Sequence, residues 1–213
     1  MNSAEESRQE RKKRELREKI VQTAAELFQE QGFYNTTMEQ IAEAADVARK
    51  TLYNYFPVKE AIADSYLRDI SNGLAQESFE SLQRLPNTKS RLVAALTATY
   101  SWAEKNPELT RVVLGYRMKY DYQKPLAERP KTGTQNIVEA ILTQGQENGE
   151  IRKDFSVELL MMYVDLLRGS ITWGWLHEPD KFDMTEAMEK MVDLVLHGAS
   201  TDKRRHSANE RSV

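Results

Sequence analysis

Apolar side chains recur at helical spacing along most of the chain, which predicts an all-α protein. The first helix is predicted for residues 16–31, and its apolar stripe consists of Leu16, Ile20, Ala24, Leu27 and Phe28. A longer helix is predicted from Val58 to about Leu85, with Ile62, Tyr66, Ile70 and Leu74 at steps of four. Turn signals separate further helices, which are predicted over residues 88–105, 107–120, 125–148, 156–177 and 183–198.

Two short helices are predicted between the first helix and the long one. Thr37 begins the earlier of the two, with Gln40 three positions later as its capping-box partner. After a tight connection at residues 46–47, the segment Ala48 to Phe56 forms the other, and Pro57 ends it. Three helices within about 40 residues, the last two short and tightly joined, are typical of a helix-turn-helix.

The second of these short helices has one polar and one apolar face. Leu52 and Phe56 are spaced to point inward, and the opposite face carries Arg49, Lys50, Tyr53 and Asn54. Arginine and lysine can donate to guanine, asparagine can pair with adenine, and a tyrosine hydroxyl suits a phosphate. A solvated helix face is the alternative interpretation. We expect Thr37, at a helix start, and Lys59, just after Pro57, to bind phosphates beside this helix.

The segment from Phe28 to Ile62, FQEQGFYNTTMEQIAEAADVARKTLYNYFPVKEAI, resembles the signature of TetR/AcrR-type repressors. The likeness runs over residues 16–62 and consists of GF, TTxxxIA and TLYNYFxxKE. It implies an N-terminal three-helix DNA-binding domain and a larger helical domain for ligand binding and dimerisation. It also implies DNA-contacting positions at Thr37, Arg49, Lys50, Thr51, Tyr53, Asn54 and Lys59.

The turn between the two short helices departs from the family pattern of a glycine followed by Val-Ser. This chain has Asp46, Val47 and Ala48 instead. Aspartate tolerates left-handed backbone geometry better than most residues. Alanine in place of a serine cap costs about 1 kcal/mol. We therefore expect the motif to fold with a weaker cap on the helix that follows.

The chain divides into four predicted parts. Residues 1–15 are expected to be a flexible charged arm, 16–62 the helix-turn-helix domain, 63–198 the ligand-binding and dimerisation domain, and 199–213 a disordered tail. The apolar run through 159–176, with Gly169 and Gly174, suits a helix between subunits. With residues 183–198 (Met184, Ala187, Met188, Met191, Val192, Val195) it predicts a four-helix homodimer interface.

Charge and composition limit the functions that the protein can have. The formal net charge is −3, and residues 1–59 contain ten basic and ten acidic residues, so only clusters can attract DNA. One cluster, residues 8–19, has seven basic and three acidic residues. The chain has no cysteine and three histidines, with no HExxH motif or glycine-rich phosphate loop. We expect no cofactor, no metal site and no enzymatic activity.

Aromatic residues and a few charged ones mark an expected effector site in the larger domain. The candidates are Trp102, Tyr116, Arg117, Tyr120, Asp165, Arg168 and Trp173. Most such aromatics belong to a core or an interface in any helical protein, and Asp165 and Arg168 are spaced for a mutual salt bridge.

These features predict a ligand-responsive repressor that binds a palindromic, double-stranded DNA operator as a homodimer and is released by a small molecule. The alternative has the same fold and is controlled by a protein partner or by abundance. The charged N-terminus and the absence of a long apolar run indicate a cytoplasmic, nucleoid-associated protein without membrane contact.

Overall fold

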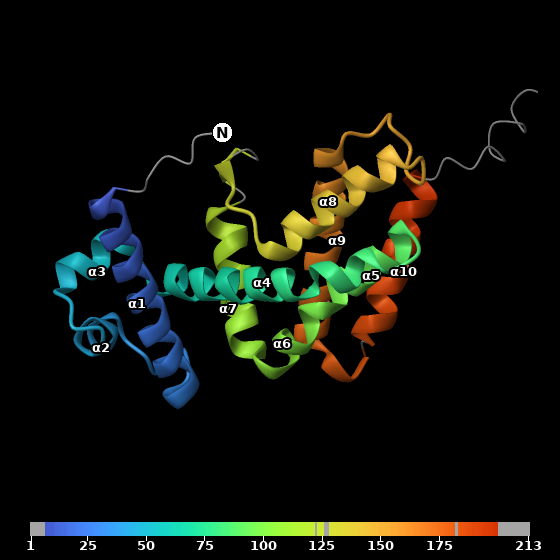
Figure 1. The fold of residues 1–213 in the computed structure, drawn as a ribbon. Coiled ribbons are helices and arrows are strands. Elements are labelled where there is room, and N and C mark those ends of the chain that lie inside the picture. The colour runs from blue at the N-terminus through green and yellow to red at the C-terminus, as the bar shows by residue number, and fades with distance from the viewer. Residues whose placement is uncertain (1–6, 122, 126–127, 182, 200–213) are drawn as a thin grey trace, which may run out of the picture. The chain divides into compact units, whose positions relative to one another are not determined.

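A computed structural model describes residues 7–121, 123–125, 128–181 and 183–199. The regular elements of these residues are helices, without a β-strand, which confirms the all-α prediction (Figure 1). They are α1 (Arg8–Gln31), α2 (Met38–Ala44), α3 (Arg49–Tyr55), α4 (Lys59–Gln83), α5 (Thr88–Ala98), α6 (Tyr100–Lys105), α7 (Pro107–Tyr120), α8 (Gly133–Glu147), α9 (Val157–His177), the short 3₁₀ helix η2 (Pro179–Lys181) and α10 (Met184–Ala199).

The helices form two compact units. The first unit contains residues up to Ile70 together with Asn106–Pro130, and the second contains Ser71–Lys105 and the residues from Lys131 on. Helix α4 contributes to both, and α7 belongs to the first unit with the three N-terminal helices. In the described part of the chain, no helix combines the length and the apolar character that a membrane span requires.

Helix α1 starts earlier than its apolar stripe predicts. A capping box begins it, because the Ser7 hydroxyl accepts from the Glu10 N–H at 3.2 Å and the Glu10 carboxylate accepts from the Ser7 N–H at 2.9 Å. Ion pairs one turn apart, Arg11–Glu15 and Arg14–Glu18, follow it. The predicted flexible arm is therefore wrong for residues 8–15; residues 1–6 lie outside the described part, as do 200–213 of the predicted tail.

The first unit is organised around the apolar faces of the N-terminal helices. Ile20, Ala24, Ile41, Leu52 and Ile62 are all fully buried. Phe56, one turn after Leu52, is 3% exposed, so both residues point inward as their spacing predicts. This packing fixes which face of α3 is left to solvent.

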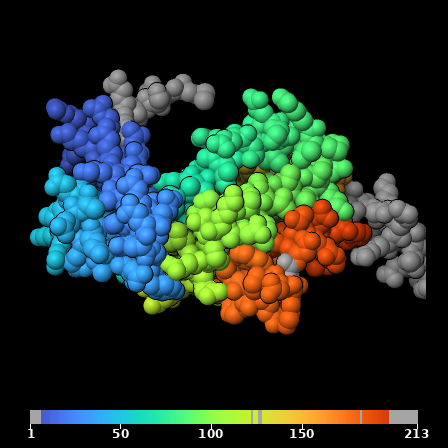
Figure 2. All heavy atoms as spheres, turned by 90° about the horizontal axis from the view of Figure 1, so that it is seen from below, coloured from blue at the N-terminus to red at the C-terminus, as the bar shows by residue number. Residues whose placement is uncertain are grey.

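The second unit has a largely aliphatic core shared by α5, α8, α9 and α10. Its most deeply buried side chains include Leu92, Leu96, Leu142, Leu160 and Met184. Figure 2 shows α5, in green, beside α10, in red. Met184, Met188, Met191 and Val192 are at most 4% exposed within the single chain. They belong to its own core, so the prediction that they form a subunit interface is wrong.

Two predicted helix boundaries in this unit are also wrong. The expected helix 88–105 is interrupted at Thr99, and the expected helix 125–148 begins only at Gly133. The late start follows from the capping box of Thr132 and Gln135, preceded by Pro130, which disfavours helix in the residue before it. Gly133 is required there, because a Cβ would lie 2.7 Å from the Asn72 Cα of α4.

Candidate nucleic-acid interface

Helix α3 presents a polar surface on an apolar support. Arg49, Lys50, Tyr53 and Asn54 are exposed, Tyr53 with 46% of its surface, and Thr51 is half-buried. Leu52, on the opposite face, is fully buried. A short helix with this arrangement can enter a major groove and offer several hydrogen-bonding side chains to base edges and phosphates.

The turn before α3 has the left-handed backbone geometry that its aspartate tolerates. Asp46 adopts φ 53°, the left-handed conformation usually taken by glycine, and the Val47 N–H donates to the Ala42 carbonyl at 2.9 Å. Ala48 occupies the N-cap position and offers no side-chain hydrogen bond to the helix. The chain therefore keeps the helix-turn-helix geometry while lacking the family's glycine and its hydroxyl cap.

An ion pair connects α3 with α2. The Arg49 guanidinium lies 3.8 Å from the Glu39 carboxylate, and both side chains are largely exposed. Such a pair contributes little to stability. Its effect is on orientation, because it gives the first residue of α3 a partner on α2.

The start of α2 is well organised. The Thr37 N–H donates to Gln40 Oε1 at 2.8 Å, and the Gln40 N–H donates to the Thr37 hydroxyl at 3.2 Å. Gln31 of α1 also donates to Gln40 Oε1. The capping box predicted for these residues is confirmed. It holds the first turn of α2 at the surface, where unpaired amides favour an anion.

Lys59 has partners inside the first unit that the sequence did not predict. Its ammonium donates to the carbonyls of Phe33 and Thr36, each at 2.5 Å, and lies 4.2 Å from the centre of the Phe33 ring. Burial lowers the pKa of this ammonium, and the carboxylates of Glu60 and Glu108 act in the opposite direction. Lys59 thus anchors the loop between α1 and α2 to the start of α4.

A second anchor reaches the same loop from α7. The Glu108 carboxylate, in the first turn of α7, accepts from the Phe33 N–H at 2.7 Å. Two separate elements, α4 and α7, therefore hold the segment that leads into α2. Nothing in the sequence marks this contact, because its partners are 75 residues apart.

A buried cluster of charges joins α4 to α7. Arg68 Nε lies 2.8 Å from Asp64 Oδ2, and Arg68 Nη2 lies 2.8 Å from Asp121 Oδ2. Arg117 Nε donates to Asp64 Oδ1 at 2.5 Å. The side chains of Asp64, Arg68 and Asp121 are only 10–12% exposed. We call Asp64, Arg68, Arg117 and Asp121 the α4–α7 ion cluster.

Three of the predicted effector residues lie on α7 beside this cluster. The rings of Tyr116 and Tyr120 are 4.9 Å apart, and Arg117 belongs to the cluster itself. Burial raises the pKa of the Tyr116 phenol, and the nearby carboxylates of Asp64 and Asp121 raise it further.

The other four predicted effector residues lie in the second unit. Arg168 Nη2 lies 3.6 Å from Asp165 Oδ1, so the predicted salt bridge between them is confirmed. Gln135 also donates to Asp165 at 2.6 Å. Trp173 packs against His177 with ring centres 5.7 Å apart, and Trp102 is half-buried on α6. The structure thus places the seven candidates in two groups, one in each unit.

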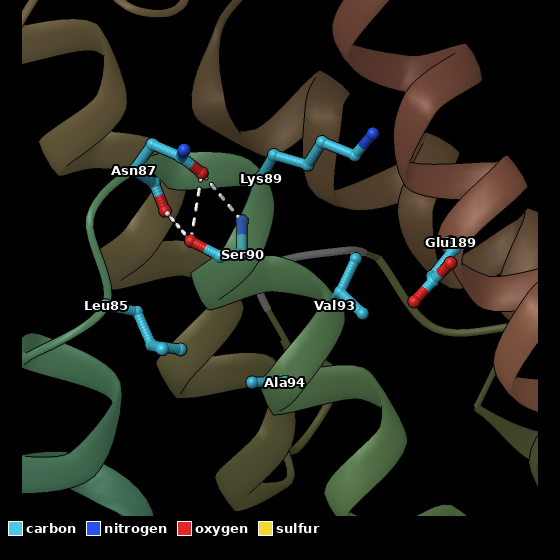
Figure 3. A pocket seen from close by; sticks show the side chains of 7 residues that line it. All are labelled: Leu85, Asn87, Lys89, Ser90, Val93, Ala94 and Glu189. Atoms are coloured by element: carbon cyan, nitrogen blue, oxygen red, sulfur yellow. Dashed lines mark hydrogen bonds between the residues drawn. The ribbon is translucent and has the colours of Figure 1, made fainter.

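A pocket of about 450 Å³ occurs elsewhere in the second unit (Figure 3). It is lined by Leu85, Asn87, Lys89, Ser90, Val93, Ala94 and Glu189. None of the seven predicted effector residues lines it. Among the described residues there is no group of three or more acidic or histidine side chains placed to hold a metal ion.

The N-terminal geometry, a polar helix held by a tight turn against a second short helix, is that of a helix-turn-helix. Residues 20–66 match the model of the bacterial regulatory proteins of the tetR family. The matched residues run from α1 into α4 and include the whole helix-turn-helix.

Similar proteins extend the likeness beyond the DNA-binding domain. The chain is 24% identical over 180 residues to the fatty acid metabolism regulator protein of Bacillus subtilis, covering 84% of this chain and 93% of the relative. It is 31% identical over 114 residues to the nucleoid occlusion factor SlmA of Photorhabdus laumondii, covering 53% and 57%. The crystal structure of Thermus thermophilus FadR, a TetR family transcriptional repressor in complex with lauroyl-CoA, superposes with a TM-score of 0.73 at 28% identity. That match covers 85% of this chain and 94% of the other.

Proposed function

We propose that this protein is a ligand-responsive repressor that binds a palindromic DNA operator as a homodimer and is released by a small molecule. The exposed face of α3 is the observation that carries the proposal. Arg49, Lys50 and Asn54 would read base edges, and Thr37, Thr51 and Tyr53 would contact the backbone. Lys59 would act beside them by holding the loop before α2, because its ammonium already has partners in the protein.

An apolar face left exposed on the second unit supports the homodimer. Met162 and Leu166, one turn apart on α9, are 43% and 61% exposed, and Leu194 of α10 is 65% exposed. A Cβ added at Gly169 would meet nothing within 4 Å, so another helix could approach there. A two-fold dimer built on this face would carry two copies of α3. An operator with half-sites about 34–36 Å apart would suit that symmetry.

Fatty acyl thioesters are the effectors that we propose first. Support comes from Thermus thermophilus FadR, whose complex contains lauroyl-CoA. In this chain, the Nε of Arg168 is buried without a hydrogen-bond partner among the described residues. Buried polar groups are nearly always satisfied, so this atom would suit a polar group of an effector.

The response would pass from the effector to DNA along α4 and α7. The α4–α7 ion cluster connects these helices, and each of them holds the loop before α2 through Lys59 or Glu108. An effector must bind the two arrangements of these helices with different affinity, with a coupling of typically about 1–3 kcal/mol.

A regulator controlled by a protein partner or by abundance is the second candidate. One observation favours it: Arg117 is bound to Asp64, and Asp165 to both Gln135 and Arg168, so three charged candidates are partnered within the chain. A thermal-shift titration with lauroyl-CoA, with free CoA as control, separates the two. A ligand specific to the folded state raises Tm with concentration. An unchanged Tm with a series of acyl thioesters would favour the second candidate.

The DNA-binding half of the proposal is tested by selecting bound duplexes from a random library with the purified protein. We expect a two-fold symmetric site. Arg49→Ala and Asn54→Ala should each reduce discrimination at one position by about 1–3 kcal/mol. Lys153→Ala, a charge removed from the second unit, is the control and should leave the selected sequence unchanged. A selected site without symmetry would contradict the dimer, and full discrimination by the α3 variants would contradict the reading face.

A further inference from the structure

The chain contains two asparagines that are followed by glycine, Asn72 before Gly73 and Asn148 before Gly149. This dipeptide is prone to deamidation, because glycine has no side chain to shield its backbone nitrogen. Both asparagines are exposed to solvent. A Cβ added at either glycine would meet nothing within 4 Å. Sequence and exposure therefore do not distinguish the two sites, whereas their backbone geometry does.

The first of these asparagines is held inside a long helix. Asn72 lies in the middle of α4, which runs without interruption from Lys59 to Gln83. Its Cα also packs against the start of α8, since a Cβ at Gly133 would lie 2.7 Å from it. Deamidation requires the next backbone nitrogen to approach the asparagine Cγ, which helical geometry prevents. Opening the interior of a helix costs more than fraying its end, so the fold protects Asn72.

The second asparagine lies where a helix ends. Asn148 is the C-cap of α8, and Gly149 follows with a left-handed φ of 78°. The Asn148 N–H donates to the Gln144 carbonyl at 2.9 Å, whereas the Gly149 N–H makes a longer turn contact of 3.3 Å with the Gln146 carbonyl. Helix ends fray at little cost. The Gly149 nitrogen can therefore reach the Asn148 side chain without unfolding α8.

The reaction consumes only water. Hydroxide removes the proton from the Gly149 nitrogen, which then bonds to Cγ of Asn148. The Cγ–Nδ2 bond breaks, and ammonia leaves with a proton from water, which restores the hydroxide. Water next opens the cyclic succinimide. Cleavage at Cγ yields aspartate, and cleavage at the main-chain carbonyl carbon yields isoaspartate, in which the main chain runs through Cβ and is longer.

The turn that follows Asn148 is attached to α5 within the second unit. The Glu150 carboxylate accepts from the Thr88 N–H, at the start of α5, at 2.8 Å, and Ile151 is 1% exposed. Both products place a carboxylate at the C-terminal end of α8, where the helix dipole disfavours negative charge. Isoaspartate also lengthens the main chain just before Glu150. Modification would therefore weaken the attachment of this turn to α5.

We propose that Asn148 is a site of spontaneous deamidation, and that its modification loosens the second unit as the protein ages. The observation that carries the proposal is the contrast between the end of α8 and the interior of α4 at two identical, exposed dipeptides. The proposal is independent of DNA binding and of any effector. It assigns a reaction to a turn that the proposed function leaves unused.

The first test measures the two sites in the same full-length protein, incubated at mildly alkaline pH. Trypsin releases them in separate peptides, residues 69–84 and 132–152, and mass spectrometry with an isoaspartyl methyltransferase assay quantifies each product. In folded protein we expect Asn148 to react at least about tenfold faster than Asn72. In concentrated urea the two rates should become similar, because neither site is then structured. Equal rates in the folded protein would overturn the proposal.

The second test measures the consequence by thermal unfolding of fresh and incubated protein. Asn148→Gln is the resistant variant, because the longer glutamine side chain closes a ring much more slowly. Asn72→Gln is the matched control. We expect incubation to lower the Tm of the wild type and of Asn72→Gln, and to leave that of Asn148→Gln unchanged. An unchanged Tm in modified wild type, or an equal loss in Asn148→Gln, would overturn the role given to this turn.

Discussion

Both units of this protein have apolar cores, and the first adds a buried cluster of ion pairs between α4 and α7. In the first unit, α7 buries Leu109 and Val113 and also makes polar contacts that are long-range in sequence: the α4–α7 ion cluster and the Glu108–Phe33 hydrogen bond. In the second unit, aliphatic side chains such as Leu96, Leu142 and Leu160 form the core. An apolar core accepts other apolar side chains of similar volume, whereas a buried ion pair requires its specific partner. The α4–α7 ion cluster is therefore the better place for a two-state response.

The largest expected effect comes from breaking the buried cluster. Asp64→Ala leaves the guanidiniums of Arg68 and Arg117 without one of their carboxylates, and losing one partner of a buried pair typically costs about 3–5 kcal/mol. Urea denaturation measures the free energy of unfolding. Adding Arg117→Met should restore part of the loss, because it removes one uncompensated charge. No recovery in the double variant would contradict the role given to the cluster.

A substitution in the core of the second unit can serve for comparison, because it removes apolar packing and no charge. Leu142 is fully buried, and Leu142→Ala should lower the free energy of unfolding by about 2–5 kcal/mol through lost burial and a cavity. The same denaturation experiment measures it, with Phe79→Ala, at a 53% exposed position of the same unit, as control. A loss below 1 kcal/mol, within the range expected of surface changes, would show that this core is loosely packed.

The contact between α7 and the loop before α2 is expected to act locally. Glu108→Gln weakens a charge-assisted hydrogen bond to the Phe33 N–H, of a kind worth about 1.5–3 kcal/mol. Hydrogen exchange of the Phe33 amide should accelerate, while amides of α8 keep their protection. Unchanged exchange at Phe33 would mean that Lys59 alone holds the loop.

The missing cap of α3 can be restored. Ala48→Ser introduces a hydroxyl at the N-cap, which should stabilise the first unit by about 1 kcal/mol. Thermal unfolding measures the gain, and Ala48→Gly, which adds no hydroxyl, is the control. A gain from serine no larger than that from glycine would show that the cap geometry is not available.

The smallest expected effect concerns an exposed ion pair of the second unit, for comparison with the buried cluster. The hydrogen bond from Lys89, 2.6 Å away, lowers the pKa of the Asp193 carboxyl. A carboxyl with a depressed folded pKa stabilises the fold above its unfolded pKa of about 4, and this contribution is lost as pH falls. Lys89→Gln should raise the pKa of Asp193, followed by carbon-13 NMR, with little change in stability at neutral pH. A large loss of stability would mean that this exposed ion pair contributes as much as the buried pairs of the α4–α7 ion cluster, so that burial does not determine the contribution.

The sequence predicted the geometry of the helix-turn-helix well because the signals for this motif are local. The inward spacing of Leu52 and Phe56, the capping box of Thr37 and Gln40, and the left-handed turn at Asp46 each involve residues within a few positions of one another. The apolar stripe alone did not predict where α1 begins. There, helix propensity, a cap and ion pairs one turn apart extend the helix without an apolar stripe.

The candidate sites were harder to predict where partners are distant. Lys59 reads as a surface cation in the sequence, but its ammonium is held by carbonyls more than 20 residues away. The sequence indicates Arg117 as a candidate effector residue but does not indicate its partner Asp64, because 53 residues separate them. The methionines of α10 have the spacing of an interface, and only packing shows that they are buried within the chain.

The sequence by itself determined the helices, the helix-turn-helix and the polar face of α3, because periodicity, caps and turn geometry depend on neighbouring residues. Tertiary structure alone decided that α7 joins the N-terminal unit, that a buried ion cluster connects it to α4, and that Arg17 of α1 lies against the Phe56 ring at the end of α3. These arrangements depend on which distant side chains meet once the apolar faces are buried, and a linear pattern does not encode those pairings.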